Sequence, residues 1–178
     1  MIGVDDGKFT PKTRGSVLVV GVVFRGGKSV EAVMHTHITI DGLDATEKLA
    51  KMILSSPHHH QLRLVMLSGL TFGGFNLVHI QHLHAATGLP VMVVTSDKPD
   101  LEAVRLALMH LPKSEERWGI VQAAGEIFEV NNLSGKVYVE LAGLSLEEAK
   151  VVLAVTSARS SIPEPVRVAH LVASGVTS

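Results

Sequence analysis

The chain has 178 residues and a formal net charge of −1, with 46% hydrophobic and 19% charged residues. This composition is typical of a folded globular protein and excludes a disordered chain. The near-neutral charge excludes a global basic field, so a nucleic-acid partner must be held locally or through bound metal. No run is apolar enough to span a bilayer and no signal segment opens the chain, so we expect a cytoplasmic protein with no membrane partner.

The length and the cysteine count narrow the class further. At 178 residues we expect one domain over residues 1–178 with a sizeable core. The absence of cysteine excludes disulfides and thiolate metal sites. The sequence carries no signal for an oligomeric state.

The first quarter of the chain is rich in β-forming residues. Residues 1–5 and the run SVLVVGVVFRGGKSVEAVMHTHITI predict three antiparallel strands, with Gly26 and Gly27 at the hairpin turn. A helix follows, with Asp44 as its N-cap and apolar residues at helical spacing up to Ser56.

The remaining elements alternate between strands and helices. LRLVMLSG and LPVMVVT are typical of buried parallel strands. NLVHIQHLHAATG and DLEAVRLALMH predict helices, capped by Asn76 and Asp100, and two further helices close the chain after a mixed segment. The order β-β-β-α-β-α-β predicts an α/β protein with a ribonuclease H-like mixed sheet: three antiparallel strands, then parallel strands, with helices on both faces.

The stretch GVDDG places two acids at the end of the first strand. In the predicted fold the fourth strand lies beside the first, so Asp5 and Asp6 face Ser68, and the helix carrying Glu47 begins over the same point. From the residues alone an acidic turn is the more common explanation of Asp5 and Asp6. Glu47 is explained equally well by a capping box with Asp44.

Several motifs together resemble one family. GVDDG, VVGVVFRGG, IDGLDATE, LSGLTFGGFN and IPEPVRVAHLVASG, spread over nearly the whole chain, resemble the endonuclease dU family, which is largely archaeal. That family is similar to endonuclease V, a metal-dependent enzyme that nicks nucleic acid beside deaminated bases.

The resemblance implies a magnesium-dependent endonuclease, a hydrolase of phosphodiester bonds in DNA or RNA. It places Asp5, Glu47 and Ser68 at the catalytic positions, with Asp5, Asp6 and Glu47 as ligands of Mg²⁺ or Mn²⁺. Carboxylate oxygens are the ligands that Mg²⁺ prefers, and the ion polarises the phosphate. Three features depart from endonuclease V: Ser68 stands where an acid is expected, residues 142–144 contain no histidine, and Lys98 is displaced.

Glycines after the fourth strand permit a ligand to approach the backbone closely. We expect Gly69, Gly73 and Gly74 to contact substrate in this way. The run is not a phosphate-binding P-loop, since no Gly-Lys-Ser/Thr follows.

Two arginines and one histidine near the C-terminus are further candidates. Arg159 and Arg167 flank IPEP and have the fork geometry that binds phosphate, with a salt bridge to Glu164 or Glu148 as the alternative. His170 lies in a region that often faces the metal site in ribonuclease H-like folds, so we expect it near the scissile phosphate, with a packed structural histidine as the alternative.

The other histidines are weaker candidates for the functional site. Residues 58–60 precede the fourth strand and so lie at the opposite end of the sheet from the acids. His79 and His82 have the i, i+3 spacing of a metal pair on a helix, but no further ligand is near in sequence, which argues against zinc.

Two functions from different classes follow. The first is a divalent-metal-dependent endonuclease, acting near deaminated bases. The second is a nucleic-acid or nucleotide-binding protein of the same fold with weakened catalysis, favoured by Ser68 and the near-neutral charge. A small-molecule site at residues 69–74 is a third.

Overall fold

A computed structural model describes residues 1–10, 14–132 and 134–177 of the chain. Its strands and helices follow the expected order, with short additions. In chain order the elements are β1 (Ile2–Asp6), β2 (Ser16–Arg25), β3 (Ser29–Thr39), α1 (Ala45–Leu54), the 3₁₀ turn η1 (His59–Gln61), β4 (Val65–Leu67), β5 (Thr71–Phe72), β6 (Asn76–Leu77), α2 (Ile80–Thr87), β7 (Val91–Thr95), α3 (Leu101–Leu108), α4 (Ser114–Ala123), β8 (Phe128–Asn132), β9 (Gly135–Ala142), α5 (Leu146–Thr156) and α6 (Glu164–Val176).

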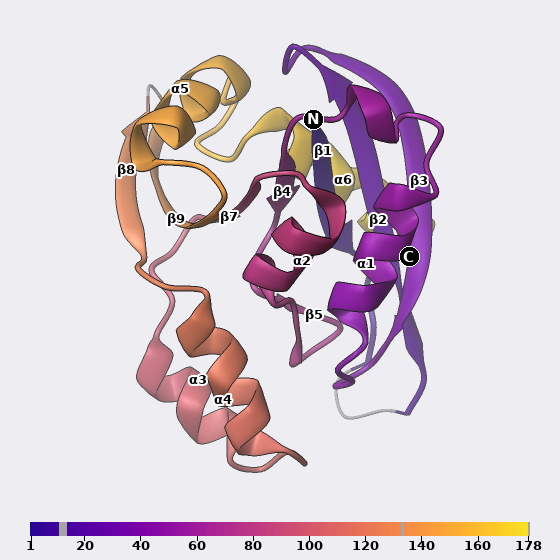
Figure 1. Cartoon of the computed structure of the whole chain (residues 1–178), viewed down its shortest axis with the longest axis vertical. Coiled ribbons are helices and arrows are strands. Elements are labelled where there is room, and N and C mark those ends of the chain that lie inside the picture. Colours follow the sequence, from indigo (N-terminus) through magenta and orange to yellow (C-terminus); the bar gives the residue numbers. More distant parts are fainter. Residues whose placement is uncertain (11–13, 133, 178) are drawn as a thin grey trace.

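The main sheet confirms the predicted fold class. Its strand order is β3-β2-β1-β4-β7-β9-β8 (Figure 1). Strands β1, β4 and β7 are parallel, and β2 and β3 pair antiparallel on one side of them. This is the mixed sheet of a ribonuclease H-like fold. Since the carboxyl ends of β1, β4 and β7 meet at one edge, side chains there converge.

The turn between β2 and β3 forms where the glycine pair predicts it. Gly26 and Gly27 have φ values of 57° and 70°, a region that only glycine adopts without strain. Arg25 pairs directly with Ser29 across the turn. The hairpin prediction is therefore confirmed.

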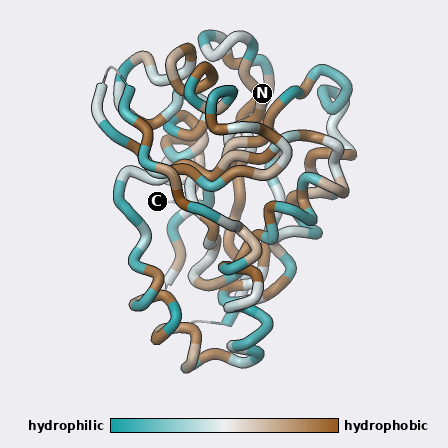
Figure 2. Tube along the Cα trace, turned by 60° about the vertical axis from the view of Figure 1, so that its left-hand side comes forward, coloured by the Kyte–Doolittle hydropathy of each residue, from teal (hydrophilic) through white to brown (hydrophobic). Residues whose placement is uncertain are grey.

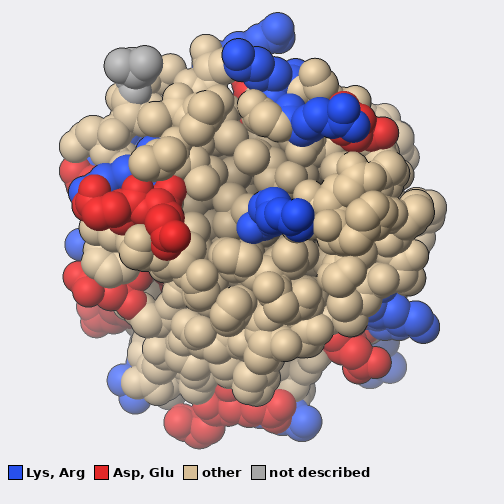
Figure 3. Space-filling view, turned by 45° about the horizontal axis from the view of Figure 1, so that its top comes forward, with Lys and Arg blue, Asp and Glu red and all other residues tan. Residues whose placement is uncertain are grey.

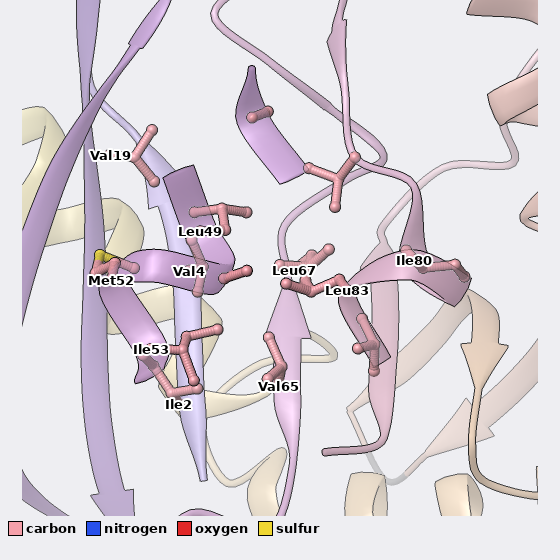
Figure 4. Close-up of a cluster of buried hydrophobic side chains, with 14 of the residues drawn as sticks. Ile2, Val4, Val19, Leu49, Met52, Ile53, Val65, Leu67, Ile80 and Leu83 are labelled. Atoms are coloured by element: carbon pink, nitrogen blue, oxygen red, sulfur yellow. The ribbon is translucent and has the colours of Figure 1, made fainter. Parts of the chain in front are cut away.

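Helices cover both faces of the sheet, as predicted. Helices α1 and α2 pack on the face to which Val4 and Leu67 point, where their apolar side chains form a continuous core (Figure 4). Helix α6 lies behind β1 and β2 on the other face, against Val20 and Val22 (Figure 1). Strand side chains alternate between faces, so neighbouring residues of β1 belong to different layers.

Gly3 lets α6 approach β1 unusually closely. A Cβ atom built at Gly3 would lie 2.1 Å from the backbone carbon of Pro165, so no larger residue fits. The first turn of α6 therefore lies directly on β1. The position of this helix matters for the site, because it carries His170.

The predicted cap at Asn76 is wrong. Asn76 lies in β6, and α2 begins after His79, whose Nδ1 accepts a hydrogen bond from the His82 backbone. The Asn76 amide instead crosses to α1, where its Oδ1 accepts from the Ala45 backbone N–H. Asp44 occupies the N-cap position of α1 but bonds to Thr39 and Asn76 rather than to the helix. The first turn of α1 is therefore capped by Asn76, which is distant in sequence, and not by the side chain of Asp44.

The segment expected to be mixed contains regular structure. Helix α4 packs beside α3, and β8 and β9 form an antiparallel hairpin that extends the sheet next to β7. Helices α3 and α4 lie together at the lower end of the view in Figure 1, away from the centre of the sheet. Arg105 of α3 stacks on Trp118 of α4, 5.3 Å from the ring centre.

Apolar residues follow the sheet interior. In Figure 2 the most hydrophobic segments run through the middle of the molecule, and hydrophilic ones lie mainly at turns and along the outer surface. Among the described residues, no helix combines the length and apolar character that crossing a membrane requires.

Candidate functional site

A cavity of about 760 Å³ lies at the carboxyl ends of the central parallel strands. It collects many of the residues singled out from the sequence: Asp5, Asp6, Ser68, Gly69, Arg167 and His170 all line it. Its other walls come from β7 and β9, from α3 and α4, and from the segment before α6. The volume is within the range of small-molecule and cofactor sites.

Asp5 is the centre of the polar cluster. Its Oδ1 accepts hydrogen bonds from the Ser68 hydroxyl at 2.5 Å and from the Asp6 backbone N–H at 2.9 Å. Its Oδ2 lies 2.8 Å from Nδ1 of His170. Asp5 is only 6% exposed, so these contacts hold its carboxylate in one orientation.

His170 presents its second ring nitrogen to the surroundings. Since a carboxylate only accepts hydrogen bonds, Nδ1 carries the proton shared with Asp5, and Nε2 of the neutral ring is an acceptor. The His170 side chain is 64% exposed, so Nε2 is accessible. This is the arrangement of a histidine that an acid orients for proton transfer.

Asp6 follows Asp5 at the end of β1, and its carboxyl group lies close to that of Asp5. Its Oδ2 accepts a hydrogen bond of 2.7 Å from the backbone N–H of Gly73. Burial raises the pKa of Asp6 to about 6, and the nearby charge of Asp5 acts in the same direction, while the Gly73 bond opposes it. Gly73 therefore supports Asp6 and does not itself line the cavity.

Arg117 holds the loop that carries Gly73. Arg117 as a whole is 3% exposed, and its guanidinium donates hydrogen bonds to four backbone carbonyls, those of Asp41, Gly42, Phe75 and Pro112. No sequence pattern indicates this role, since the partners are backbone atoms, most of them far away in the chain. Helix α4 is thereby tied to the loops beside the site.

Glu47 is not brought to the cavity. It lies on α1, which packs on the face opposite Asp5, and its side chain is exposed. The sequence predicts that Glu47 and Ser68 both lie near Asp5, and of these two only Ser68 does. Strand alternation explains the separation, because Val4 faces α1 and the next residue, Asp5, faces α6.

Glu140 is a cavity residue that sequence reasoning missed. It lies in β9, opposite Val93 of β7, and is 5% exposed. No described residue donates a hydrogen bond to its carboxyl group, and burial raises its pKa to about 7. The sequence signal for this residue is an acid inside the β-forming run VYVELAG. A buried charge is unfavourable in such a strand, so an acid there indicates a functional position.

The two arginines differ. Arg167 lines the cavity but is engaged in a two-bond pair with Glu164, at 2.8 and 2.7 Å, and this pairing lowers the pKa of Glu164. The salt-bridge alternative therefore describes Arg167. Arg159 and Gly74 are not among the lining residues.

The remaining histidines lie elsewhere. His59 and His60 belong to η1, which precedes β4 and so lies at the other end of this strand from Ser68. His79 and His82 stack on each other with ring centres 3.5 Å apart, and His79 caps α2. This stacking explains the pair without a metal.

The donors around Asp5 fit a divalent ion only if the substrate helps to hold it. Among the described residues, no three His, Asp or Glu side chains are close enough together to ligate one ion. Asp5 and Asp6 supply hard oxygen atoms at the cavity, and Ser68 adds a neutral one. Because Mg²⁺ is commonly bound through one or two carboxylates, with waters and substrate phosphates completing its shell, such an ion fits here together with a phosphate.

Known proteins of similar sequence cover the whole chain. The profile of the family described as Endonuclease dU matches residues 1–177. A UPF0215 protein from Methanosarcina mazei is 45% identical over 99% of this chain and 90% of its own length. A crystal structure of a protein of unknown function from Archaeoglobus fulgidus is 42% identical, with a TM-score of 0.89 over 98% of this chain and 96% of that chain.

A more distant likeness concerns the fold. The crystal structure of Ciona intestinalis endonuclease V, in complex with DNA that contains inosine, has a TM-score of 0.58 and 11% identity, over 94% of this chain and 83% of that chain. At this identity the comparison shows a shared fold, which agrees with the strand order found here. The match over residues 1–177 shows that this chain belongs to the endonuclease dU family.

Proposed function

We propose that this protein is an endonuclease that hydrolyses phosphodiester bonds in nucleic acid at the Asp5 cluster. The observation that carries the proposal is the contact between the buried Asp5 carboxylate and Nδ1 of His170 at the wall of an open cavity. The family to which the chain belongs supports it. The DNA held by the similarly folded Ciona protein supports nucleic acid as the ligand.

The chain's own groups have separable tasks in this reaction. Asp5 keeps the His170 ring in one orientation with the proton on Nδ1, so Nε2 takes a proton from the attacking water. Ser68 holds the other oxygen of Asp5 and so restricts its rotation. A Mg²⁺ or Mn²⁺ ion held by Asp5 and Asp6 would, when bound, polarise the phosphate and stabilise developing negative charge.

We expect the protein to contact nucleic acid through a few basic side chains near the cavity rather than through an extended basic surface. On the face shown in Figure 3, basic and acidic side chains form small separate groups within a mostly uncharged surface. Lys98 lines the cavity and supplies positive charge beside the site, while the charge of Arg167 is paired with Glu164. Affinity should therefore fall less steeply with salt than it does for proteins that contact many phosphates.

The substrate class that we propose is a strand carrying a deaminated base, hypoxanthine or uracil. The test is a gel assay with labelled DNA and RNA strands, with and without such a base, in Mg²⁺ and in Mn²⁺. We expect nicking by the natural protein and its loss in Asp5→Asn, which removes the charge but keeps the size of the side chain. Equal nicking by Asp5→Asn would refute the proposed site.

The second candidate function is binding without cleavage. It is favoured by Ser68, which occupies the place of a further carboxylate, and by the lack of three converging acids or histidines among the described residues. The same strands distinguish the two functions. Tight binding in both metals with no nicking at any strand would establish the binding protein.

A further inference from the structure

Glu140 is a largely buried residue whose carboxyl oxygens reach the cavity surface and have no hydrogen-bond donor among the described residues. Its side chain is 5% exposed and lines the cavity, and no described backbone or side-chain group donates a hydrogen bond to it. Leaving a buried carboxyl group unpaired is unfavourable, and such groups in folded proteins usually have partners or a role. A ligand that donates hydrogen bonds from within the cavity would satisfy it.

Part of the wall of the cavity that Glu140 lines is apolar. Leu77, Val104 and Val121 line the same cavity and belong to one cluster formed between β6, α3 and α4. Leu77 is 1% exposed and Val121 is 6% exposed. A flat, largely apolar ring with a polar edge matches this combination of apolar walls and one carboxyl group.

Glu140 and Asp5 lie in different parts of the cavity. Val4 of β1 pairs with Leu67, Leu67 with Val93, and Val93 with Glu140, so three strand spacings separate the two acids. At the usual distance between strands this is about 14 Å along the sheet. A group bound at Glu140 therefore does not compete with a phosphate at Asp5.

We propose that Glu140 is the specificity-determining residue of a nucleobase subsite, where its carboxyl group accepts a hydrogen bond from a ring N–H of the bound base. This inference rests on the proposed function, because the base reaches the cavity as part of a strand. Enzymes that act on one nucleotide commonly turn its base out of the stack into a pocket with apolar walls.

The chemistry of the edge decides which bases fit. Uracil and hypoxanthine carry a proton on the ring nitrogen of their pairing edge, whereas cytosine and adenine present a bare acceptor nitrogen at the same point. Above the pKa of Glu140, about 7, the group is a carboxylate, and a bare nitrogen facing it leaves two acceptors opposed and the carboxylate unsatisfied. Sites built on such a buried polar group discriminate strongly against the analogue that cannot pair with it.

The experiment compares strands that differ in one base only. Binding of single strands with a central uracil or cytosine, and of a second pair with hypoxanthine or adenine, is measured by fluorescence anisotropy without divalent metal, so that no strand is cut. We expect the natural protein to prefer the base with the ring N–H by about tenfold, the scale of one well-made buried hydrogen bond.

Three variants isolate the role of Glu140. Glu140→Gln adds amide N–H donors that can pair with a bare ring nitrogen and should reduce the preference, whereas Glu140→Leu should bind both members of each pair equally. Glu126→Leu removes an exposed acid that does not line the cavity and should behave as the natural protein. Removing a buried unpaired acid should raise thermal stability, so melting curves check that the variants fold.

Each outcome bears on one proposal separately. An undiminished preference in Glu140→Leu, or no preference in the natural protein, would overturn the subsite even if strands are nicked, and the endonuclease would stand. A preference that depends on Glu140 without any nicking in metal would support the subsite and refute the endonuclease.

Discussion

The Ser68 hydroxyl donates a hydrogen bond of 2.5 Å to Oδ1 of Asp5. The contact follows from the parallel register of β1 and β4, in which Val4 pairs with Leu67, so the next residue of each strand lies side by side. The Ser68 side chain therefore lies beside the Asp5 carboxylate. It orients Asp5 but adds no negative charge.

Ser68→Asp should strengthen metal binding. The added carboxylate would lie against Asp5, where the two negative charges repel each other unless a cation lies between them. We expect tighter Mn²⁺ binding by calorimetry and faster nicking of hypoxanthine- and uracil-containing strands.

The control for this change is Ser68→Asn, which has nearly the same shape as Asp without its charge and should give neither gain. Adding Asp5→Ala to Ser68→Asp should abolish both gains. If a well-folded Ser68→Asp protein shows unchanged affinity and nicking, the assignment of a metal to this pair is wrong.

His170→Ala should reduce nicking with little effect on folding. Proton transfer by a positioned histidine is commonly worth about 10²–10⁴ in rate. The side chain is 64% exposed, so its removal leaves no large cavity. The measurement is the nicking rate of both proteins under the same conditions, with melting curves to confirm that the variant folds. An undiminished rate in the variant would exclude proton transfer by His170.

Replacing His58, His59 and His60 by Ser should leave nucleic-acid binding and nicking unchanged. These residues precede β4, whose far end carries the site. A parallel anisotropy and gel assay checks this, and a large loss of activity would contradict the placement of the site at the carboxyl ends of the strands.

Arg117→Met should destabilise the protein strongly. Arg117 is only 3% exposed, and the substitution removes its hydrogen bonds to four backbone carbonyls. Orphaned buried acceptors make the expected loss about 3 kcal/mol, a fall in Tm of roughly 5–10 °C. Arg117→Lys, which keeps the charge but not the planar fork, should recover only part of this loss. Calorimetric melting measures both, and an unchanged Tm in Arg117→Met would show that the carbonyl contacts are not stabilising.

The buried Glu140 should make the free energy of unfolding decrease as the pH rises. Its pKa is raised from 4.5 to about 7 in the folded protein, so between these values the native state binds more protons than the unfolded state. Stability must then decrease with pH across that interval, by about 3 kcal/mol once the shift is complete. Urea unfolding of Glu140→Gln should therefore show a gain at pH 8 and almost none at pH 4. Asp6 acts in the same direction, with a pKa of about 6, and cancels in this comparison. Equal gains at both pH values would exclude Glu140 as the cause.

Much of the fold could be predicted because its signals are local. The glycine pair at 26 and 27 selects a hairpin turn, and the capping box of Ser145 with Glu148 marks the start of α5. Alternating and helical apolar patterns gave the order of the elements, and that order is sufficient to select a ribonuclease H-like sheet. The hairpin β8–β9 was missed because short apolar runs between polar residues do not distinguish strand from loop.

The sequence by itself determined the order of the main elements up to β7, the class of sheet and the presence of acids at the end of β1. Only the tertiary structure decided which groups meet there. The pleat turns Asp5 toward α6 and so toward His170, while Glu47 remains exposed on the opposite face. Asn76 does not cap α2, because its side chain accepts a hydrogen bond from the buried backbone N–H of Ala45, which is distant in sequence. Such pairings depend on strand register and on how closely a helix approaches the sheet, and neither quantity is encoded in a short stretch of residues.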